Sequence, residues 1–400
     1  MALRICPKSK ASDLVLKGVG SSNDESYSHQ YQRCEAFYTD STFDKSGKRL
    51  SFGEVSLREA ILDVSNIAVV PTCRGNNFVK PTMGPDVSSQ DSCGSADSYF
   101  KPFFLNDHPG YEVVLQKLLD SQETLLVYLG EQNGKSFFLL DSPTLADELQ
   151  GVPELLCESL RKVGDMVAEE PQAALLAYAR GLAAFHRASG FCPTCGAPTK
   201  LYKAGAGVAC TSCRYKAYPR LDPAVITLVV FTTATGEEFA LMGKKRQWKE
   251  GMYSCLSGFA EIGESLEECL AREVLEESGV RVAPGTVRYL GTQPWPFPHS
   301  FMVGYFAEAA ARNLDGRGLP AIDFDADELE DVRWFAKPYV QQQLREGGGC
   351  PGEFCIPRRA SLANRIIRLW AFGDGGVKKR GSSGSSSSAS LLLKPTTGEQ

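Results

Sequence analysis

The pattern of apolar residues predicts that regular structure begins well inside the chain. Residues 124–130 ("TLLVYLG") and 136–141 ("SFFLLD") are apolar runs on either side of Asn133 and Gly134, a pair typical of two-residue hairpin turns. An alanine-rich run follows from about Pro171, with apolar residues at helical spacing. We therefore expect a β-hairpin and then a long helix.

A second series of elements begins at Pro223. The run "AVITLVVF" is continuously apolar and β-branched, as in a buried strand, and residues 238–243 ("EFALMG") suit its hairpin partner. Farther on, Ser265 and Glu268 have the spacing of a capping box, and Gly279 suits a helix end. The apolar stripe between them is Leu266, Cys269, Leu270 and Val274. This pattern predicts an amphipathic helix.

The two ends of the chain have a different composition. Residues 1–105 are rich in Ser, Gly, Asp and Asn, so we expect a poorly ordered or loop-rich segment, and residues 373–400 a flexible tail. No apolar run approaches the ~20 residues that a membrane-spanning helix needs. The basic N-terminus lacks the apolar core of a secretory signal, which leaves an organelle-targeting peptide as an alternative.

Charge and cysteine content narrow the class of protein. The chain has 400 residues, enough for two or three domains, and its 43 basic and 48 acidic residues give a net charge of −5. This balance argues against a general nucleic-acid-binding surface but leaves room for a local basic groove. Nine of the 13 cysteines are scattered, which suits a reducing intracellular compartment.

The other four cysteines form two matched pairs. "CPTC" holds Cys192 and Cys195, and "CTSC" holds Cys210 and Cys213. Two such turns complete a tetrahedral zinc site, and four protein ligands leave no open position, so the zinc would be structural. Redox dithiols or free thiols are the alternative, which the spacing disfavours.

Acidic residues lie on the other face of the predicted helix, away from the apolar stripe. Glu273, Glu276 and Glu277 lie three or four positions apart, so their carboxylates share one patch. We expect Arg272 to neutralise one of them, with Glu268 one turn away to pair with it. The remaining charge suits hard divalent cations, which also bind phosphate oxygens. A solvated acidic face is the alternative.

The residues around this helix resemble a known motif. Residues 258–280, "GFAEIGESLEECLAREVLEESGV", match every specified position of the Nudix box. Those positions are Gly258, Glu264, Arg272, Glu273, Val274, Glu276, Glu277, Gly279 and Val280. The resemblance implies a hydrolase that splits nucleoside diphosphates linked to another group, using magnesium or manganese on an α/β/α sandwich.

A further resemblance narrows the subfamily. "QPWPFPHS" after the box is similar to the signature of NADH pyrophosphatases, with Thr292 where that subfamily usually has serine. The same subfamily carries a four-cysteine zinc ribbon before the catalytic domain. The likeness also includes residues 218–226, 327–335 and 360–370, and extends over about 175–370. Three alternating prolines exclude a helix or a central strand at 292–300, so we expect a stiff loop.

The resulting expectation is an α+β protein with a Nudix α/β/α sandwich preceded by a zinc ribbon and an N-terminal mixed α/β domain. The expected parts are 1–105, loop-rich; 106–190, N-terminal domain; 191–221, zinc ribbon; 222–372, Nudix hydrolase domain; and 373–400, tail.

The resemblance also implies roles for individual residues. The catalytic group is Arg272, Glu273, Glu276 and Glu277, with Glu276 or Glu277 activating water. The magnesium or manganese ligands are the Ser257 carbonyl, Glu264, Glu273, Glu277 and Glu328. Phe259 and Tyr218, the latter from the second subunit of a homodimer, clamp the nicotinamide. The remaining substrate-binding residues are Gln293, Pro294, Trp295, Pro296, Phe297, Pro298, His299, Ser300 and Ala363. Taken alone, Trp295 and Phe297 suit a core equally well.

The expected activity is metal-dependent hydrolysis of NADH, NAD or NADPH to AMP and the corresponding nicotinamide mononucleotide, with no membrane partner. Removal of the cap from NAD-capped RNA by the same chemistry is one alternative. A catalytically silent binding module is another, which the intact box disfavours. The compartment is left open between the cytoplasm and an organelle such as a peroxisome, chloroplast or mitochondrion.

Overall fold

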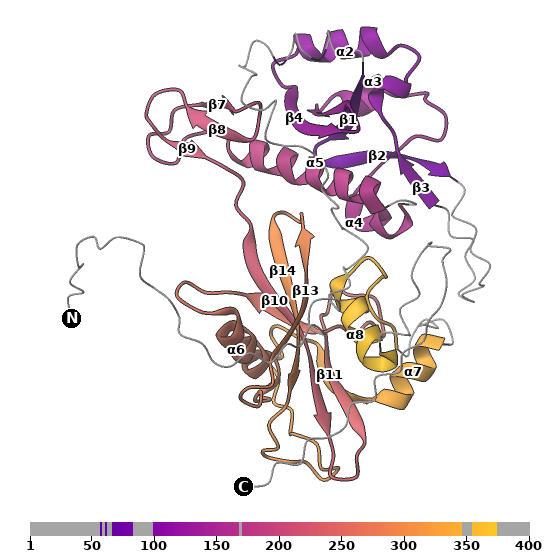
Figure 1. Ribbon diagram of the computed structural model, residues 1–400, viewed down its shortest axis with the longest axis vertical. Coiled ribbons are helices and arrows are strands. Elements are labelled where there is room, and N and C mark those ends of the chain that lie inside the picture. The colour runs from indigo at the N-terminus through magenta and orange to yellow at the C-terminus, as the bar shows by residue number, and fades with distance from the viewer. Residues whose placement is uncertain are drawn as a thin grey trace, which may run out of the picture. The chain divides into compact units, whose positions relative to one another are not determined.

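Two β-sheets with helices packed on them carry most of the fold, and a three-stranded sheet lies between them in the sequence (Figure 1). The computed structural model describes Leu57, Ile61 and residues 66–82, 99–167, 170–345 and 354–373. Within these ranges, every helix is too short or too polar to cross a membrane.

The first sheet has the strand order β3-β2-β1-β5-β4, with β6 beside β2. Its strands are β1 (Ile67–Cys73), β2 (Asn76–Thr82), β3 (Tyr99–Pro102), β4 (Leu125–Gln132), β5 (Lys135–Asp141) and β6 (Leu156–Glu158). Only β1 and β5 pair in parallel among the described strands of this sheet. The predicted hairpin of β4 and β5 is confirmed, and its turn residues Asn133 and Gly134 have φ of 52° and 73°. Such left-handed values are what a two-residue turn requires.

Part of the N-terminal prediction was wrong. We expected loops up to residue 105, yet β1, β2 and β3 lie there. In β1, Ala68 and Val70 belong to one buried cluster and Val69 to another, so both faces of the strand are covered. A polar segment separates β2 from β3, which is why composition alone obscured these strands. Residues 1–56 and 374–400 lie outside the described ranges, and their predictions stand untested.

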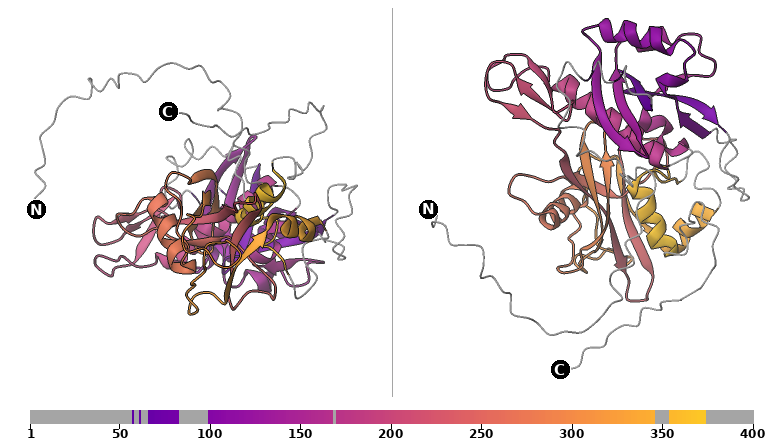
Figure 2. Two further views of the ribbon diagram at one scale, coloured as in Figure 1. Left: turned by 90° about the horizontal axis from the view of Figure 1, so that it is seen from below. Right: turned by 45° about the horizontal axis from the view of Figure 1, so that its top comes forward.

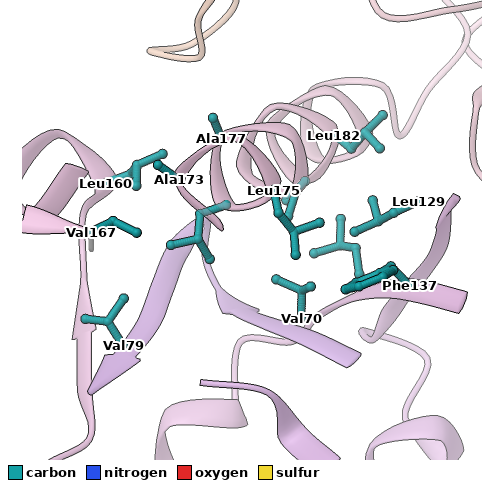
Figure 3. Close-up of a cluster of buried hydrophobic side chains, with 14 of the residues drawn as sticks. Val70, Val79, Leu129, Phe137, Leu160, Val167, Ala173, Leu175, Ala177 and Leu182 are labelled. Carbon is teal, nitrogen blue, oxygen red and sulfur yellow. The ribbon is translucent and has the colours of Figure 1, made fainter. Parts of the chain in front are cut away.

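Helices cover both faces of the first sheet. One face packs against η3 (Leu105–Asp107), α2 (Tyr111–Asp120) and α3 (Leu145–Glu148). The other packs against α4 (Leu160–Val163), η4 (Gly164–Met166) and α5 (Glu170–Ala188). Figure 3 shows Leu175 and Leu182 of α5 above Val70, Leu129 and Phe137 of the strands. The predicted long helix is therefore confirmed, and its apolar side packs against the sheet.

The three-stranded sheet is fixed to the first sheet through a hairpin turn. Its strands, in the order β7-β8-β9, are β7 (Thr199–Tyr202), β8 (Gly207–Cys210) and β9 (Lys216–Ala217). The Tyr128 N–H donates to the Ala204 carbonyl at 3.1 Å, and His186 Nε2 lies 2.8 Å from the Gly205 carbonyl. Gly205 has φ of +88°, and a Cβ there would lie 2.6 Å from Val127. Glycine therefore permits this close approach.

The second sheet forms the middle layer of an α/β/α sandwich, as predicted. Its order is β13-β14-β10-β11-β15, with β12 beside β10. The strands are β10 (Asp222–Thr232), β11 (Glu238–Lys244), β12 (Leu256–Phe259), β13 (Arg288–Trp295), β14 (Ser300–Glu308) and β15 (Asp331–Ala336). Val225 and Val229 face α6 (Leu266–Ser278), while Ile226 and Leu228 face α8 (Leu362–Phe372). Figures 1 and 2 show α6 on one side of this sheet, and α7 (Lys337–Arg345) with α8 on the other.

The proline-rich segment is partly strand, which corrects the expectation of a stiff loop at 292–300. Residues 292–295 complete β13, Ser300 begins β14, and residues 296–299 form the turn between them. Within the described part of the sheet, β13 has β14 as its single neighbour. An edge strand tolerates proline because one side of its backbone needs no ladder hydrogen bond.

The close approach at Gly205 predicts a specific loss of stability. Gly205→Ala should lower the thermal midpoint more than Gly236→Ala, whose glycine has nearly the same φ (+86°) but open space around its Cβ position. Both changes cost about 1–2 kcal/mol for the left-handed backbone. Only the first adds an overpacking cost of about 1–3 kcal/mol against Val127. Equal losses in a thermal melt would contradict the contact.

Candidate active site

Helix α6 begins and ends as its sequence predicts. The Ser265 hydroxyl accepts from the Glu268 N–H at 3.2 Å, and the Glu268 carboxylate accepts from the Ser265 N–H at 2.8 Å. Gly279 ends the helix at φ of 69°. Because Glu268 is used in this capping box, the predicted pairing of Glu268 with Arg272 was wrong. The buried face of α6 includes Cys269, Leu270 and Val274.

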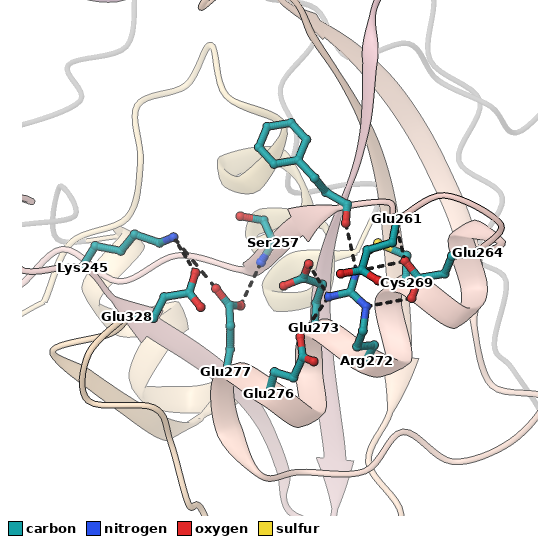
Figure 4. Close-up of polar contacts among 11 residues, drawn as sticks. Lys245, Ser257, Glu261, Glu264, Cys269, Arg272, Glu273, Glu276, Glu277 and Glu328 are labelled. Carbon is teal, nitrogen blue, oxygen red and sulfur yellow. Dashed lines mark hydrogen bonds and ion pairs between the residues drawn. The ribbon is translucent and has the colours of Figure 1, made fainter.

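Arg272 joins the loop before α6 to the helix itself. Its Nε and Nη2 donate to the two oxygens of Glu264 at 2.8 and 2.9 Å, and Nη2 also donates to the Phe259 carbonyl at 2.9 Å. Nη1 donates to Glu273 at 2.8 Å and to Glu276 at 2.9 Å (Figure 4). The hydrogen bonds that Arg272 donates to Glu264 lower the pKa of this carboxyl to about 2. One guanidinium therefore positions three of the predicted carboxylates.

Gly258 is required by the position of the Glu273 carboxylate. A Cβ at residue 258 would lie 1.8 Å from Glu273 Cδ, so any larger residue would displace that carboxylate. Burial raises the pKa of Glu273, while Arg272 opposes the rise. The first glycine of the motif is thus needed for space around the carboxylate.

Glu277 is the buried carboxylate of the site. Its side chain is 1% exposed, and Oε2 accepts from the Ser257 N–H at 3.1 Å. Lys245, directly after β11, has its Nζ 4.0 Å from Glu277 Oε1 and 3.5 Å from Glu328 Oε1. Burial raises the pKa of Glu277 to about 8, with Lys245 acting in the opposite direction. Lys245 was not predicted from the sequence, because a lysine at a strand end is too common to indicate a site.

The predicted carboxylates fall into two groups. Arg272 holds Glu264, Glu273 and Glu276, whereas Lys245 lies between Glu277 and Glu328. The groups interact, since the charge of Glu273 raises the pKa of Glu277 and that of Glu328 raises the pKa of Glu273. Carboxylate oxygens suit a hard divalent cation, which would relieve this repulsion.

The four predicted cysteines form a second candidate metal centre. The sulfur atoms of Cys192, Cys195, Cys210 and Cys213 all lie within 4.8 Å of one another. The Cys192–Cys213 and Cys195–Cys210 sulfur pairs are 3.6 and 3.5 Å apart. Metal–sulfur bonds of about 2.3 Å in a tetrahedron place sulfurs roughly 3.7 Å apart, so the cluster fits one metal ion.

The two aromatics of the predicted clamp are accessible but are not in contact. Phe259, at the end of β12, is 56% exposed, and Tyr218, just after β9, is 46% exposed. Tyr218 packs edge-to-face on Tyr202 of β7, with the ring centres 6.0 Å apart. No ring contact between Tyr218 and Phe259 occurs in the part of the chain that the structure describes.

Gln293 links β13 to the start of α8. Its Nε2 donates to the Ala360 carbonyl at 2.6 Å, and its Oε1 accepts from the Leu362 N–H at 2.8 Å. With both ends of its amide bonded and 3% exposure, this side chain fixes the start of α8 to β13. Ala363 is buried on α8.

The rest of the proline-rich segment lies partly at the surface. Pro294 is half-buried, and Pro296 and Ser300 are buried, whereas Pro298 and His299 are exposed. The imidazole of His299 lies 2.9 Å from the carboxylate of Asp222.

Trp295 and Phe297 anchor the turn to the first sheet's helices. Their rings meet edge-to-face at 5.0 Å and pack against the buried cluster beneath α5. Arg161 and Arg180 each lie 4.8 Å from the Phe297 ring centre, and Arg180 Nε donates to the Pro296 carbonyl at 3.0 Å. Both aromatics are half-buried and pack on this cluster, and their predicted contact with substrate stays a prediction. Neither arginine has a local sequence signal.

Comparison with known proteins identifies the class. Residues 222–347 match the family model of the NUDIX domain. The NAD-capped RNA hydrolase NudC of Stutzerimonas stutzeri (strain A1501) is 36% identical over 242 residues, covering 60% of this chain and 76% of that protein. NudC of Mycobacterium bovis (strain BCG / Pasteur 1173P2) is 35% identical over 224 residues, covering 55% and 67%. The chain belongs to the NudC-like subfamily of the Nudix hydrolases.

The NAD-capped RNA hydrolase NUDT12 of Homo sapiens is 36% identical over 210 residues. That match covers 50% of this chain and 42% of NUDT12, so the chain spans less than half of that relative.

The buried Glu277 predicts a pH-dependent effect on stability. Its raised pKa of about 8 means that the folded protein holds this proton above the ordinary pKa of 4.5. The stability from the protonated carboxyl is complete below about pH 4.5 and is lost as the pH rises to about 8. Without added divalent ions, Glu277→Gln should therefore become more stable than the wild type as the pH rises, by on the order of 2–4 kcal/mol at pH 8–9.

Thermal melts at a series of pH values would measure this difference. Glu276→Gln is the matched control, because its carboxylate is 57% exposed and should show little change. A difference between Glu277→Gln and wild type that does not vary with pH would contradict the buried protonated state.

Proposed function

We propose that this chain hydrolyses the diphosphate bond of NAD-type dinucleotides and releases AMP and nicotinamide mononucleotide, reduced when the substrate is NADH or NADPH. Membership of the NudC-like subfamily supports the reaction class. The observation that carries the proposal is the carboxylate pair on α6. Glu273 is held by Arg272, and Glu277 is buried beside Ser257 and Lys245.

The carboxylates of Glu273, Glu277 and Glu328, with the Ser257 carbonyl, would hold Mg²⁺ or Mn²⁺. Oxygen ligands suit these hard cations. Burial raises the pKa of both Glu273 and Glu277, and neighbouring carboxylates raise it further, so a cation would stabilise their ionised forms. When bound, such ions offset diphosphate charge and lower the pKa of water. Glu264 was also predicted as a ligand. We assign it a positioning role, since both of its oxygens are bonded to Arg272.

Glu277 is the better candidate than Glu276 for accepting a proton from water. Glu276 is bonded to Arg272 and 57% exposed, whereas Glu277 is buried with Oε2 held by the Ser257 N–H. A raised pKa makes its carboxylate a stronger base near neutral pH. As the water oxygen bonds to phosphorus, the proton passes to Glu277 and the bridging P–O bond breaks. The leaving phosphate takes the electron pair.

Recognition of the dinucleotide would use the exposed aromatics. Phe259 lies at the end of β12, and its accessible ring suits stacking on nicotinamide. Tyr218 would complete the clamp from a second copy of the chain in a homodimer, since no contact joins the two rings in the described part of one copy. Gln293, Trp295 and Phe297 would keep the wall of the site preformed, which limits ordering on binding.

NAD-capped RNA is the second candidate substrate. The relatives named above are NAD-capped RNA hydrolases, and the same carboxylates would cut the same diphosphate in a cap. A silent binding module is disfavoured by the complete set of Arg272, Glu273 and Glu277. The compartment in which the chain acts stays a prediction.

Replacement of Glu277 tests the proposal. Glu277→Gln should lower kcat for AMP release from NADH in Mg²⁺ by a factor of about 10² or more, because the amide can neither accept the proton nor bind the ion as a carboxylate does. Glu276→Gln should lose less than about tenfold, as expected for a partly exposed positioning group. Product analysis by chromatography gives both rates. Turnover of folded Glu277→Gln close to wild type would remove Glu277 from the centre of the reaction.

The cysteine cluster predicts one bound zinc ion that supports stability. Metal analysis should find about one zinc per chain, and Cys210→Ser should lose that metal and lower the thermal midpoint, because structural zinc contributes folding energy directly. Cys157→Ser lies outside the cluster and should keep the zinc. A purified, folded chain without zinc would contradict this assignment.

A further inference from the structure

The segment that holds the cysteine cluster differs in charge from the rest of the chain. Residues 191–221 contain no Asp or Glu, although the whole chain has 48 acidic and 43 basic residues. The cations of this segment are Lys200, Lys203, Arg214, Lys216 and Arg220. None of them forms an ion pair with a carboxylate of the described chain. Zinc with four thiolates would carry about two negative charges, and the segment would still be positive.

The strand register places several of these side chains on one face of the small sheet. Lys200, Ala209 and Lys216 are paired across β7, β8 and β9, and directly paired residues share a face. Tyr202 follows Lys200 by two positions, so it lies on the same face. Contacts agree with the register, since Lys216 Nζ is 4.5 Å from the Tyr202 ring centre and 3.4 Å from its hydroxyl.

Two tyrosine rings complete this face. Tyr202 and Tyr218 meet edge-to-face, and Lys203 Nζ lies 5.5 and 5.8 Å from their ring centres. A Cβ at Gly207 would lie 3.0 Å from the Tyr218 ring, so the ring rests close to the strand backbone. We name this set the basic-aromatic face; its members are Lys200, Tyr202, Lys203, Lys216 and Tyr218. Figure 1 shows the three strands that carry it.

Both ends of the small sheet are held in place. The turn between β7 and β8 is bonded to Tyr128 and His186 through the Ala204 and Gly205 carbonyls. At the opposite end, β8 finishes in Cys210 of the metal cluster. A face anchored in this way loses little conformational freedom when a ligand binds.

We propose that the basic-aromatic face binds the single-stranded RNA that follows an NAD cap. Lysines neutralise phosphates, and accessible aromatic rings stack on unpaired bases, which is the combination that single-stranded nucleic acids use. An acidic peptide would use the lysines but not the rings. The inference rests on the proposed function, because a capped RNA brings a polynucleotide to a dinucleotide hydrolase. Glu123 and Asp141 line the same hollow as Lys200, and their carboxylates would weaken its attraction for phosphate. The test therefore uses Lys203 and Lys216.

Fluorescence anisotropy can measure binding of a 3′-labelled, NAD-capped RNA of about 12 nucleotides to the full chain, without added Mg²⁺ to prevent hydrolysis. Lys203→Glu/Lys216→Glu should weaken binding at least about tenfold at low salt. It should also flatten the slope of log affinity against log salt by about 0.7 for each lost phosphate contact. Tyr202→Ala should weaken binding about fivefold or more through lost stacking, and Tyr202→Phe should restore it.

Two controls separate this inference from the proposed function. Lys101→Glu, an exposed lysine of β3, should leave RNA affinity unchanged, and the Lys101 and Lys203/Lys216 variants should hydrolyse NADH at the wild-type rate. Unchanged RNA affinity in the double lysine variant, with NADH hydrolysis intact, would overturn the RNA site while leaving the proposed function standing. Equal competition by polyglutamate, with Tyr202→Ala without effect, would also overturn it. A wild-type chain that binds RNA by this face but leaves NADH intact would contradict only the proposed function.

Discussion

The hydrogen bonds of Arg272 are the constraint on which the catalytic site depends. Helix α6 carries a dense set of carboxylates, and like charges one turn apart destabilise a helix. Arg272 meets this by donating to Glu264, Glu273 and Glu276, and it also donates to the Phe259 carbonyl at the end of β12. Its own pKa is raised above the ordinary value by these partners, with Glu264 the largest cause. The loop and the helix are therefore joined at one charged group.

The arrangement separates two kinds of carboxylate. Glu264, Glu273 and Glu276 are hydrogen-bonded to Arg272, whose single positive charge offsets only part of theirs, whereas Glu277 lies buried beside Ser257 and Lys245. The absence of a side chain at Gly258 lets the Glu273 carboxylate lie against the neighbouring strand. A divalent cation between the two groups would be attracted by the negative charge that remains. By offsetting that charge, it would lower the pKa of the buried Glu277 and favour the ionised carboxylate that can act as a base. In the proposed reaction Glu276 would help to position Arg272 and Glu277 would accept the proton, although both lie on α6.

What could be predicted from sequence depended on how local the signals are. The capping box, the apolar stripe and the glycine end of α6 lie within fifteen residues, so the helix was predictable, and so was the cysteine cluster. Gln293 was expected to bind substrate, but it bonds Ala360 and Leu362, nearly seventy residues away. Arg180 reaches Pro296 across 116 positions. Such long-range contacts leave no trace in local periodicity, and the strands before residue 105 were obscured by the polar segment between them.

The carboxylates of Glu273, Glu277 and Glu328 are proposed to promote hydrolysis of the diphosphate in nicotinamide dinucleotides. The most direct measurement is the initial rate of product release from a panel containing NADH, NAD, NADPH, a diadenosine polyphosphate and a nucleotide sugar, each with Mg²⁺ or Mn²⁺. We expect AMP and reduced nicotinamide mononucleotide from NADH, with a higher kcat/KM than for the diadenosine compound or the sugar. Preferential hydrolysis of either of those two, or no release of AMP from any nicotinamide dinucleotide, would contradict it.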